Sequence, residues 1–345
     1  MRHQKFVIAT TVVMLAFSAV VVGLAFYSTH VARASAPNLP HSIHYLPASS
    51  NGIFGMNVQK FIQSPLYQRI QAKQGDRIGQ DLQDFIAKTG VDPTKDVQYI
   101  IAAGRPGEGK GGGVAVVVGS RKFDTDKIMT FITTNTKTAP IETPYKKGKV
   151  IMIPESDGTK LEKGIAFLSD IEIAMGDLDS LKAVLDIQAG DAAGIDTTSL
   201  GALVTSLDPN EMFWFAGDPG AVMAKNPTGN PLVGNLSAIR SIYGTLDMST
   251  AIVGNITATT ADADSANKLV SVINGFVALG SLAASQSNQS QEFKNLIGQI
   301  VINAKADINN EKKLYKVLVS LNVPFDVLGK LEQAKSQFAP RSKTE

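Results

Sequence analysis

The sequence predicts an α+β protein in which an N-terminal transmembrane helix precedes two similar halves, each an antiparallel sheet with helices. Residues 6–27 form an apolar run without a single charge, and this run predicts the transmembrane helix. Beyond it, neighbouring strand patterns are joined by short loops, which favours antiparallel pairing with helices on one face of each sheet. The same order of strands and helices occurs twice, about 140–160 residues apart, and this predicts an internal duplication.

The apolar run is long enough to cross a bilayer. At about 1.5 Å per residue it reaches roughly 33 Å, and a bilayer core is about 30 Å thick. Arg2 and Lys5 precede it, so its N-terminus is expected in the cytoplasm and the body of the chain outside. A cleaved secretory signal is the alternative, because Ala34 and Ala36 end small-residue sites of the kind that signal peptidases cut. The expected location is therefore a bacterial inner membrane, single-pass, or the periplasm after cleavage.

Composition divides the chain into five parts. Residues 1–27 are the anchor or signal segment, and residues 28–47, with three prolines, are expected to form a stalk. A first α+β domain is expected over residues 48–190 and a second over 191–338, because residues 186–199 are rich in Ala, Gly, Asp and Thr. Residues 339–345 are a tail.

Local signals place the elements of the first half. Ser64, followed by a proline, marks a helix start, and Gly90 is the expected C-cap of the helix before it. Asp124 is expected to cap another helix, and a last helix begins near Asp179. Strand patterns occur at 52–58, 97–103, 113–119, 149–153, 165–168 and 172–175.

The second half repeats this order. Asp262 is expected to start a helix, and Val323, followed by a proline, is expected to open a last one. The apolar stretch 269–284 is too short for a second membrane span and contains Ser271 and Asn274, so a core-facing helix is expected. Strand patterns occur at 212–216, 239–248, 250–259, 300–308 and 314–321.

The amino-acid inventory excludes several chemistries. The net charge is +2, which gives no electrostatic reason to expect nucleic acid as a partner. The chain has no Cys, and its four His residues all precede Tyr45. Serine and cysteine nucleophiles activated by His, and zinc sites built from His or Cys, are therefore not expected in the body, and no cofactor is expected. His41 and His44 are interpreted as part of a solvated linker and not as a metal pair.

Two short motifs suggest enzymes but lack their context. Residues 104–111 fit the start of a phosphate-binding loop, yet Gly111 replaces the Ser or Thr that holds magnesium, and a strand follows where a helix is needed. A hairpin loop is the favoured interpretation. Ser265 and Lys268 match the S-x-x-K motif of penicillin-binding enzymes, and residues 156–158 and 88–90 are similar to its two partner motifs. Their order along the chain is reversed.

Carboxylates and the single tryptophan have structural interpretations. The pairs Glu155 with Asp157 and Asp177 with Asp179 could serve a glycosidase only if they faced each other across a cleft. Asp177 and Asp179 are expected to cap a helix. Trp214 lies in the apolar segment MFWFA and is expected in the core.

Residues 46–58, and the turn Gly-Val-Asp-Pro-Thr-Lys-Asp at 90–96 before a strand, resemble a group of uncharacterised bacterial envelope proteins. These proteins have an N-terminal membrane segment and a tandem α+β body. The resemblance implies a membrane-anchored body and no particular activity, and it transfers no catalytic residue.

The expected function is that of a membrane-anchored, extracytoplasmic binding or scaffold module without enzymatic activity. Its expected partners are the membrane, through the N-terminal helix, and an envelope protein or polymer. An envelope hydrolase using Ser/Lys or paired carboxylates, and a carrier of an apolar ligand between sheet and helices, stay as alternatives. No catalytic, cofactor-binding or metal-binding residue is assigned.

Overall fold

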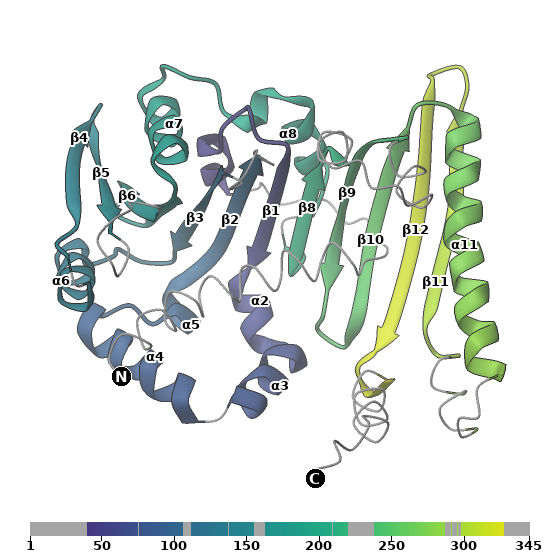
Figure 1. Cartoon of the computed structure of the whole chain (residues 1–345), viewed down its shortest axis with the longest axis horizontal. Coiled ribbons are helices and arrows are strands. Elements are labelled where there is room, and N and C mark those ends of the chain that lie inside the picture. Colours follow the sequence, from purple (N-terminus) through teal and green to yellow (C-terminus); the bar gives the residue numbers. More distant parts are fainter. Residues whose placement is uncertain are drawn as a thin grey trace, which may run out of the picture.

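The computed structural model describes residues 40–74, 76–105, 112–136, 138–154, 163–208, 210–219, 238–286, 291, 295 and 298–327. These residues form one antiparallel sheet of 12 strands with helices on its two faces, which confirms the α+β class (Figure 1). Across the sheet the strand order is β11-β12-β10-β9-β8-β1-β2-β3-β7-β6-β5-β4.

The strands lie close to the predicted segments. Their bounds are β1 Gly52–Asn57, β2 Val97–Arg105, β3 Gly112–Gly119, β4 Ile141–Tyr145, β5 Gly148–Ile153, β6 Lys163–Ser169, β7 Glu172–Gly176, β8 Phe213–Gly217, β9 Ile239–Asp247, β10 Ala251–Thr260, β11 Val301–Asn309 and β12 Leu314–Pro324. One strand, β4, was not expected. Val323 and Pro324 end β12, and helical residues follow directly at 325–327, which confirms the predicted start of a last helix.

The helices and 3-10 turns are η1 His41–Tyr45, α2 Val58–Gln63, α3 Pro65–Gln74, α4 Asp76–Thr89, α5 Pro93–Asp96, α6 Thr125–Asn135, α7 Leu178–Ala189, η2 Ile195–Thr197, α8 Ser199–Val204 and α11 Ala263–Gln286. The predicted caps Asp124, Asp177 and Gly90 are confirmed, whereas Asp179, which was also expected to cap, lies within the first turn of α7. Asp124 accepts a hydrogen bond from the Lys127 N–H at 3.0 Å, which fixes the start of α6. Gly90 ends α4 with φ +71°, a conformation that favours glycine.

The last residues of the predicted stalk are part of the fold. Ile43 and Leu46 are buried in the core, and the Ile195 N–H donates to the Leu46 carbonyl at 2.7 Å. Pro47 forms a β-bridge with Gly194. The structure therefore has a packed segment, here called the strap (residues 41–47), where the sequence predicted a spacer. His41 and His44 consequently lie on the body and not in a free linker.

Both halves of the chain contribute to a single sheet. β1 pairs with β8 along Gly52 to Met56, which joins the strands of the first half to those of the second. The region predicted as a domain boundary also packs into the first half, because Ile195 and Val204 share a core cluster with Leu181 of α7. The strand order does not test whether the halves arose by duplication, which stays a prediction.

No helix within the described residues is both long enough and apolar enough to span a bilayer. The predicted transmembrane helix at residues 6–27 lies outside the described residues.

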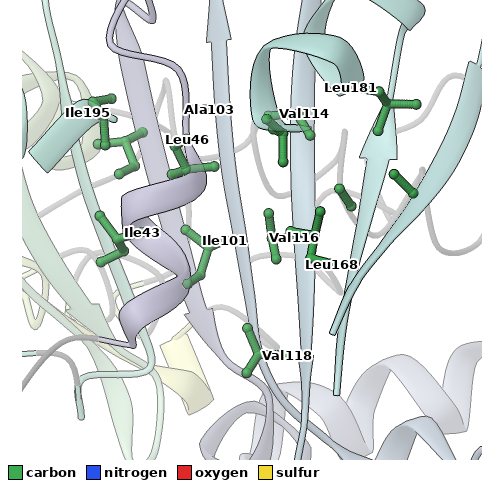
Figure 2. Packing of buried hydrophobic residues seen from close by; sticks show 14 of the residues in the cluster. Ile43, Leu46, Ile101, Ala103, Val114, Val116, Val118, Leu168, Leu181 and Ile195 are labelled. Atoms are coloured by element: carbon green, nitrogen blue, oxygen red, sulfur yellow. The ribbon is translucent and has the colours of Figure 1, made fainter. Parts of the chain in front are cut away.

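The two faces of the sheet carry separate cores. The core of the first face, to which Trp214 belongs, is covered by η1, η2, α7 and α8. Alternate residues such as Val116 and Ile101 point to this face (Figure 2). The residues between them point to the second face and pack under three groups of helices: α4 and α6 cover Ile151 and Ile173, α2 covers Phe213, and α11 covers Ala258. Among the described elements, α11 is the helix whose residues pack on β10 and β12, and it covers their second face (Figure 1).

Candidate interaction surface

One row of side chains crosses ten strands on the first face and changes character along its length. In order from β6 to β11 the row is Ala166, Ala174, Val116, Ile101, Gly55, Trp214, Thr245, Asn255, Ser320 and Asn303. The first six positions are apolar or glycine, and Trp214, the last of them, is fully buried. The four positions that follow on β9, β10, β12 and β11 carry only hydroxyl or amide groups.

The two neighbouring rows are polar over most of their positions but also contain charged residues and a leucine. Ala216 is followed by Tyr243, Thr257, Leu318 and Lys305 in one row, and Ser241, Thr259, Lys316 and Asp307 form the next. We call the first face of β9 to β12 the open face. Its side chains are Ser241, Tyr243, Thr245, Asp247, Val253, Asn255, Thr257, Thr259, Val301, Asn303, Lys305, Asp307, Leu314, Lys316, Leu318, Ser320 and Asn322. On β9, Tyr243 packs against the first-face core and Thr245 is buried, so β9 forms the border with the covered half.

Burial alternates along these strands as a sheet covered from one side requires. In β10, Ile256 and Ala258 point to α11 and are buried, whereas Asn255 and Thr257 are half-buried. In β11, the open-face residues are exposed and the alternate residues, which face α11, are half-buried. Polar residues at every second position are typical of a sheet with one face in contact with solvent or a partner.

The open face has little net charge, and its polar groups partly satisfy one another. Ser241 Oγ and Thr259 Oγ1 are hydrogen-bonded at 2.6 Å. Lys316 and Asp307 lie directly opposite each other on β12 and β11, where unlike charges are favourable. The face therefore presents mainly neutral hydrogen-bonding groups, suited to neutral hydroxyl or amide groups on a partner.

A charged cluster marks one end of the open face. Lys60 Nζ of α2 lies 3.2 Å from Asp247 Oδ2 and 3.8 Å from Glu211 Oε2. Burial raises the pKa of Glu211 above its usual value. Burial also opposes ionisation of Asp247, but hydrogen bonds from Ser249 and Lys60 outweigh it, so the pKa of Asp247 is lowered. Among the described residues no group of three or more acidic or His side chains is arranged to hold a metal ion.

A second polar cluster holds the strap on the covered half. Glu172 is buried at the start of β7 and accepts hydrogen bonds from Ser42 of the strap and from Ser169 Oγ, the latter at 2.9 Å. His44 Nδ1 lies 3.0 Å from Asp196 Oδ2, and both side chains are about two-fifths exposed. Burial, and then the charge of Glu172, raise the pKa of Tyr45.

The turn that carries the family resemblance is held by a helix cap and an ion pair. Asp92 caps α5 by accepting from the Thr94 N–H at 3.0 Å. Asp96 is buried and accepts two hydrogen bonds from the Arg121 guanidinium, both at 2.6 Å. The pKa of Asp96 is lowered, chiefly by this pairing. The motif thus joins the start of β2 to the end of β3, and its acidic residues are already engaged.

The structure does not bring the S-x-x-K motif together with residues 88–90, one of its two predicted partners. Ser265 and Lys268 lie in the first turns of α11, and Lys268 is paired with Asp264, which raises the pKa of Lys268. A raised pKa favours the protonated Lys268 amine, which cannot act as a general base. Thr89 ends α4. The strands β2, β1, β8 and β9 lie between the part of the sheet that α4 covers and the part that α11 covers, which separates the two helices by about 25 Å at about 4.8 Å per strand.

The other predicted positions have clear placements. Asp177 caps α7 by accepting from the Ser180 N–H at 2.9 Å, as expected, and also accepts from the Gly113 N–H at 2.8 Å. Burial opposes its ionisation, but these hydrogen bonds outweigh burial, so the pKa of Asp177 is lowered. Trp214 is in the core, with its ring over Gly55. Residues 106–111, Glu155 and residues 156–158 lie outside the described residues.

The sequence analysis missed the open face as a candidate site. The signal was present in the alternation of hydroxyl and amide residues with apolar ones over residues 239–260 and 301–322. It was not sufficient, because solvated strand positions have the same composition and only pairing shows which of them share a face.

The chain was compared with protein-family models, curated protein sequences and solved structures. No protein-family model and no curated protein sequence matches the chain. Solved structures of TP0453 resemble the fold. Crystal form III is 9% identical with a TM-score of 0.45, covering 88% of this chain and 100% of that chain. Crystal form IV is 8% identical with a TM-score of 0.43, covering 86% and 96% respectively.

Proposed function

We propose that this chain is a membrane-anchored, extracytoplasmic binding or scaffold protein without enzymatic activity, and that its open face binds an envelope protein or polymer. The observation that carries the proposal is the change from apolar to neutral polar side chains in the row that passes from Trp214 to Asn303. A face of four strands measures about 15 Å by about 30 Å. Small molecules are usually bound in concave apolar pockets, so a broad polar face better suits a macromolecule.

The strap supports the anchored arrangement. The apolar run at residues 6–27 would hold the chain in an inner membrane, or direct it to the periplasm if it is cleaved. The body would then be attached through the strap, which packs on the covered half. Tethering at that half leaves the open face free for a partner.

We also infer that the two halves arose by duplication. From the centre of the sheet outward, β1-β2-β3-β7-β6 runs in one direction and β8-β9-β10-β12-β11 in the other. In each half a helix, α6 or α11, follows the third strand of the series. If this inference is right, the open face corresponds to the part of the first half that α7 covers.

Photo-crosslinking in intact cells tests the binding proposal. A photoreactive residue in place of Asn303, an exposed open-face position, is expected to give a discrete adduct. Ser320→Arg in the same row should abolish that adduct, because it places a bulky charge beside the probe. A probe at Lys122, whose side chain is 80% exposed on the covered half, is the matched control and should give none.

The same experiment can overturn the proposal. Equal crosslinking at Asn303 and Lys122, or an Asn303 adduct that Ser320→Arg leaves unchanged, would mean that the open face is not the binding surface. A measurable hydrolytic turnover by the purified protein would contradict the non-enzymatic assignment.

One observation favours the carrier as a second candidate. Among the described residues, Trp214 Nε1 is a buried donor without a hydrogen-bond partner, and such donors usually have one. Trp214 is the only tryptophan, so its fluorescence reports on this site alone. A carrier should shift its emission when a long-chain fatty acid is added, and native mass spectrometry should show co-purified lipid. An unchanged emission together with no co-purified lipid would exclude the carrier and leave the binding module as the single candidate.

A further inference from the structure

The C-terminal half of α11 has an exposed apolar side. Phe276, Leu279 and Leu282 are 51%, 62% and 50% exposed, whereas Ala266 and Leu269, in the N-terminal half of the helix, are buried against the sheet. Isolated exposed apolar residues are normal on soluble proteins. Here three large ones lie within two turns of one helix, so they form a contiguous patch.

The patch also lacks charge. Residues 269–286 contain no Lys, Arg, Asp or Glu. A helix with one face in water normally carries charged residues on that face. The helices that lie in a membrane interface carry Lys and Arg on their polar side, and this stretch has none. A charged partner surface would likewise find no complement here.

The spacing within the patch suits another helix. Val272 is half-buried and lies one turn before the patch; Val272, Phe276 and Leu279 follow one another at intervals of four and then three residues, as in the apolar seam of a coiled coil. α11 lies at the edge of the sheet, where Asn274 Nδ2 donates to the Ala304 carbonyl of the edge strand β11 at 3.3 Å. The helix, and not the strand beneath it, is therefore the surface that a neighbour would meet at this end of the molecule (Figure 1).

We propose that two copies of this chain associate through α11, with the Val272–Phe276–Leu279 seam of one copy against the same seam of the other. An antiparallel pair with its two-fold axis between Phe276 and Leu279 places each of these side chains opposite the other. An uncharged seam is complementary to itself, so a second copy satisfies it without any additional group. The pairing uses the second face of the sheet and leaves the open face of both copies free.

Crosslinking of the full-length protein in membranes tests this pairing. The chain has no cysteine, so any thiol-specific product comes from the residue that is introduced. Leu279→Cys should give a covalent dimer with a short bismaleimide. Ser281→Cys is the matched control, because Ser281 is exposed nearby on a different side of α11. The dimer fraction is expected to be much higher for Leu279→Cys than for Ser281→Cys, because only Leu279 lies in the seam.

A second variant separates association from folding. Leu279→Glu keeps a good helix former at an exposed position but places charge in the seam, so the dimer should be lost while the melting temperature is unchanged. Equal crosslinking of the two cysteine variants, or a dimer that survives Leu279→Glu, would overturn the proposal. Protection of Leu279→Cys by lipid without any dimer would assign the patch to the membrane and overturn it equally.

Discussion

The two ends of the sheet use the same strand pairing for different purposes. Around Val116 and Ile101 both faces are covered by helices, and the side chains of the central row are apolar. Around Asn255 and Ser320, within the part of the chain that the structure describes, a helix, α11, packs on the second face alone, and the same row is polar. The backbone pattern is antiparallel throughout. The comparison teaches that one half supplies most of the stabilising core and the other supplies an accessible surface.

The largest expected effect compares a leucine from each half. Leu181 of α7 is fully buried, so Leu181→Ala should lower the free energy of unfolding by about 2–5 kcal/mol. Leu318 on the open face is half-buried, so Leu318→Ala should cost about 1 kcal/mol or less. Urea denaturation of both variants measures the difference. Similar losses would mean that the open face is covered as thoroughly as the first half.

A smaller effect is expected at the strap. Ser42→Ala leaves the buried Glu172 carboxylate without one of its donors and should cost about 1–3 kcal/mol. Ser320→Ala on the open face is the matched hydroxyl deletion and should cost about 0.5 kcal/mol or less. A double-mutant cycle of Ser42→Ala with Glu172→Gln should show coupling. Additive losses would show that the strap and β7 do not depend on this hydrogen bond.

The Asp96–Arg121 ion pair is expected to make the free energy of unfolding depend on pH. Because pairing lowers the pKa of Asp96 in the folded state, its contribution is present above the pKa of an unfolded-chain Asp, about 4, and is lost as pH falls through the folded value. Arg121→Gln should therefore be destabilised relative to the parent near pH 7. The gap in unfolding free energy should narrow below about pH 4. A gap that is constant from pH 7 to pH 3 would show that the ion pair is not its cause.

The smallest effect is expected at His44. Its contact with Asp196 is about two-fifths exposed on each side, and exposed ion pairs contribute about 1 kcal/mol or less. His44→Ala should therefore change the free energy of unfolding by less than Ser42→Ala does. Thermal melting of the two variants side by side tests this order. A larger loss for His44→Ala would mean that its ring, and not the Ser42 hydroxyl, holds the strap.

Local signals predicted much of the fold. Caps at Asp124 and Asp177 and the glycine at position 90 act within a few residues of themselves, so the sequence alone located these helix ends. β4 was missed because it is an edge strand with exposed residues and a proline, a composition that resembles a loop. The strap was read as a linker because its partners, Glu172 and Ile195, are more than a hundred residues away.

The candidate surface depended on long-range pairing that periodicity does not encode. β1 and β8 join the halves into one sheet through residues about 160 positions apart, whereas the sequence predicted two sheets. Thr257 and Asn255 have the composition of any solvated strand position. Only the register across β8, β9 and β10 shows that Asn255 continues the row that contains Trp214 and that Thr257 continues the row that contains Ala216.

Cysteine labelling of the purified full-length protein tests whether the second half of the sheet is covered on one face and accessible on the other. Thr257 and Ala258 are neighbours in β10, but Thr257 points to the open face and Ala258 is buried under α11. Thr257→Cys should react readily with a water-soluble maleimide, and Ala258→Cys should react only after unfolding. Slow labelling of both cysteines in the folded protein would contradict the account, because it would mean that both faces of the second half are covered.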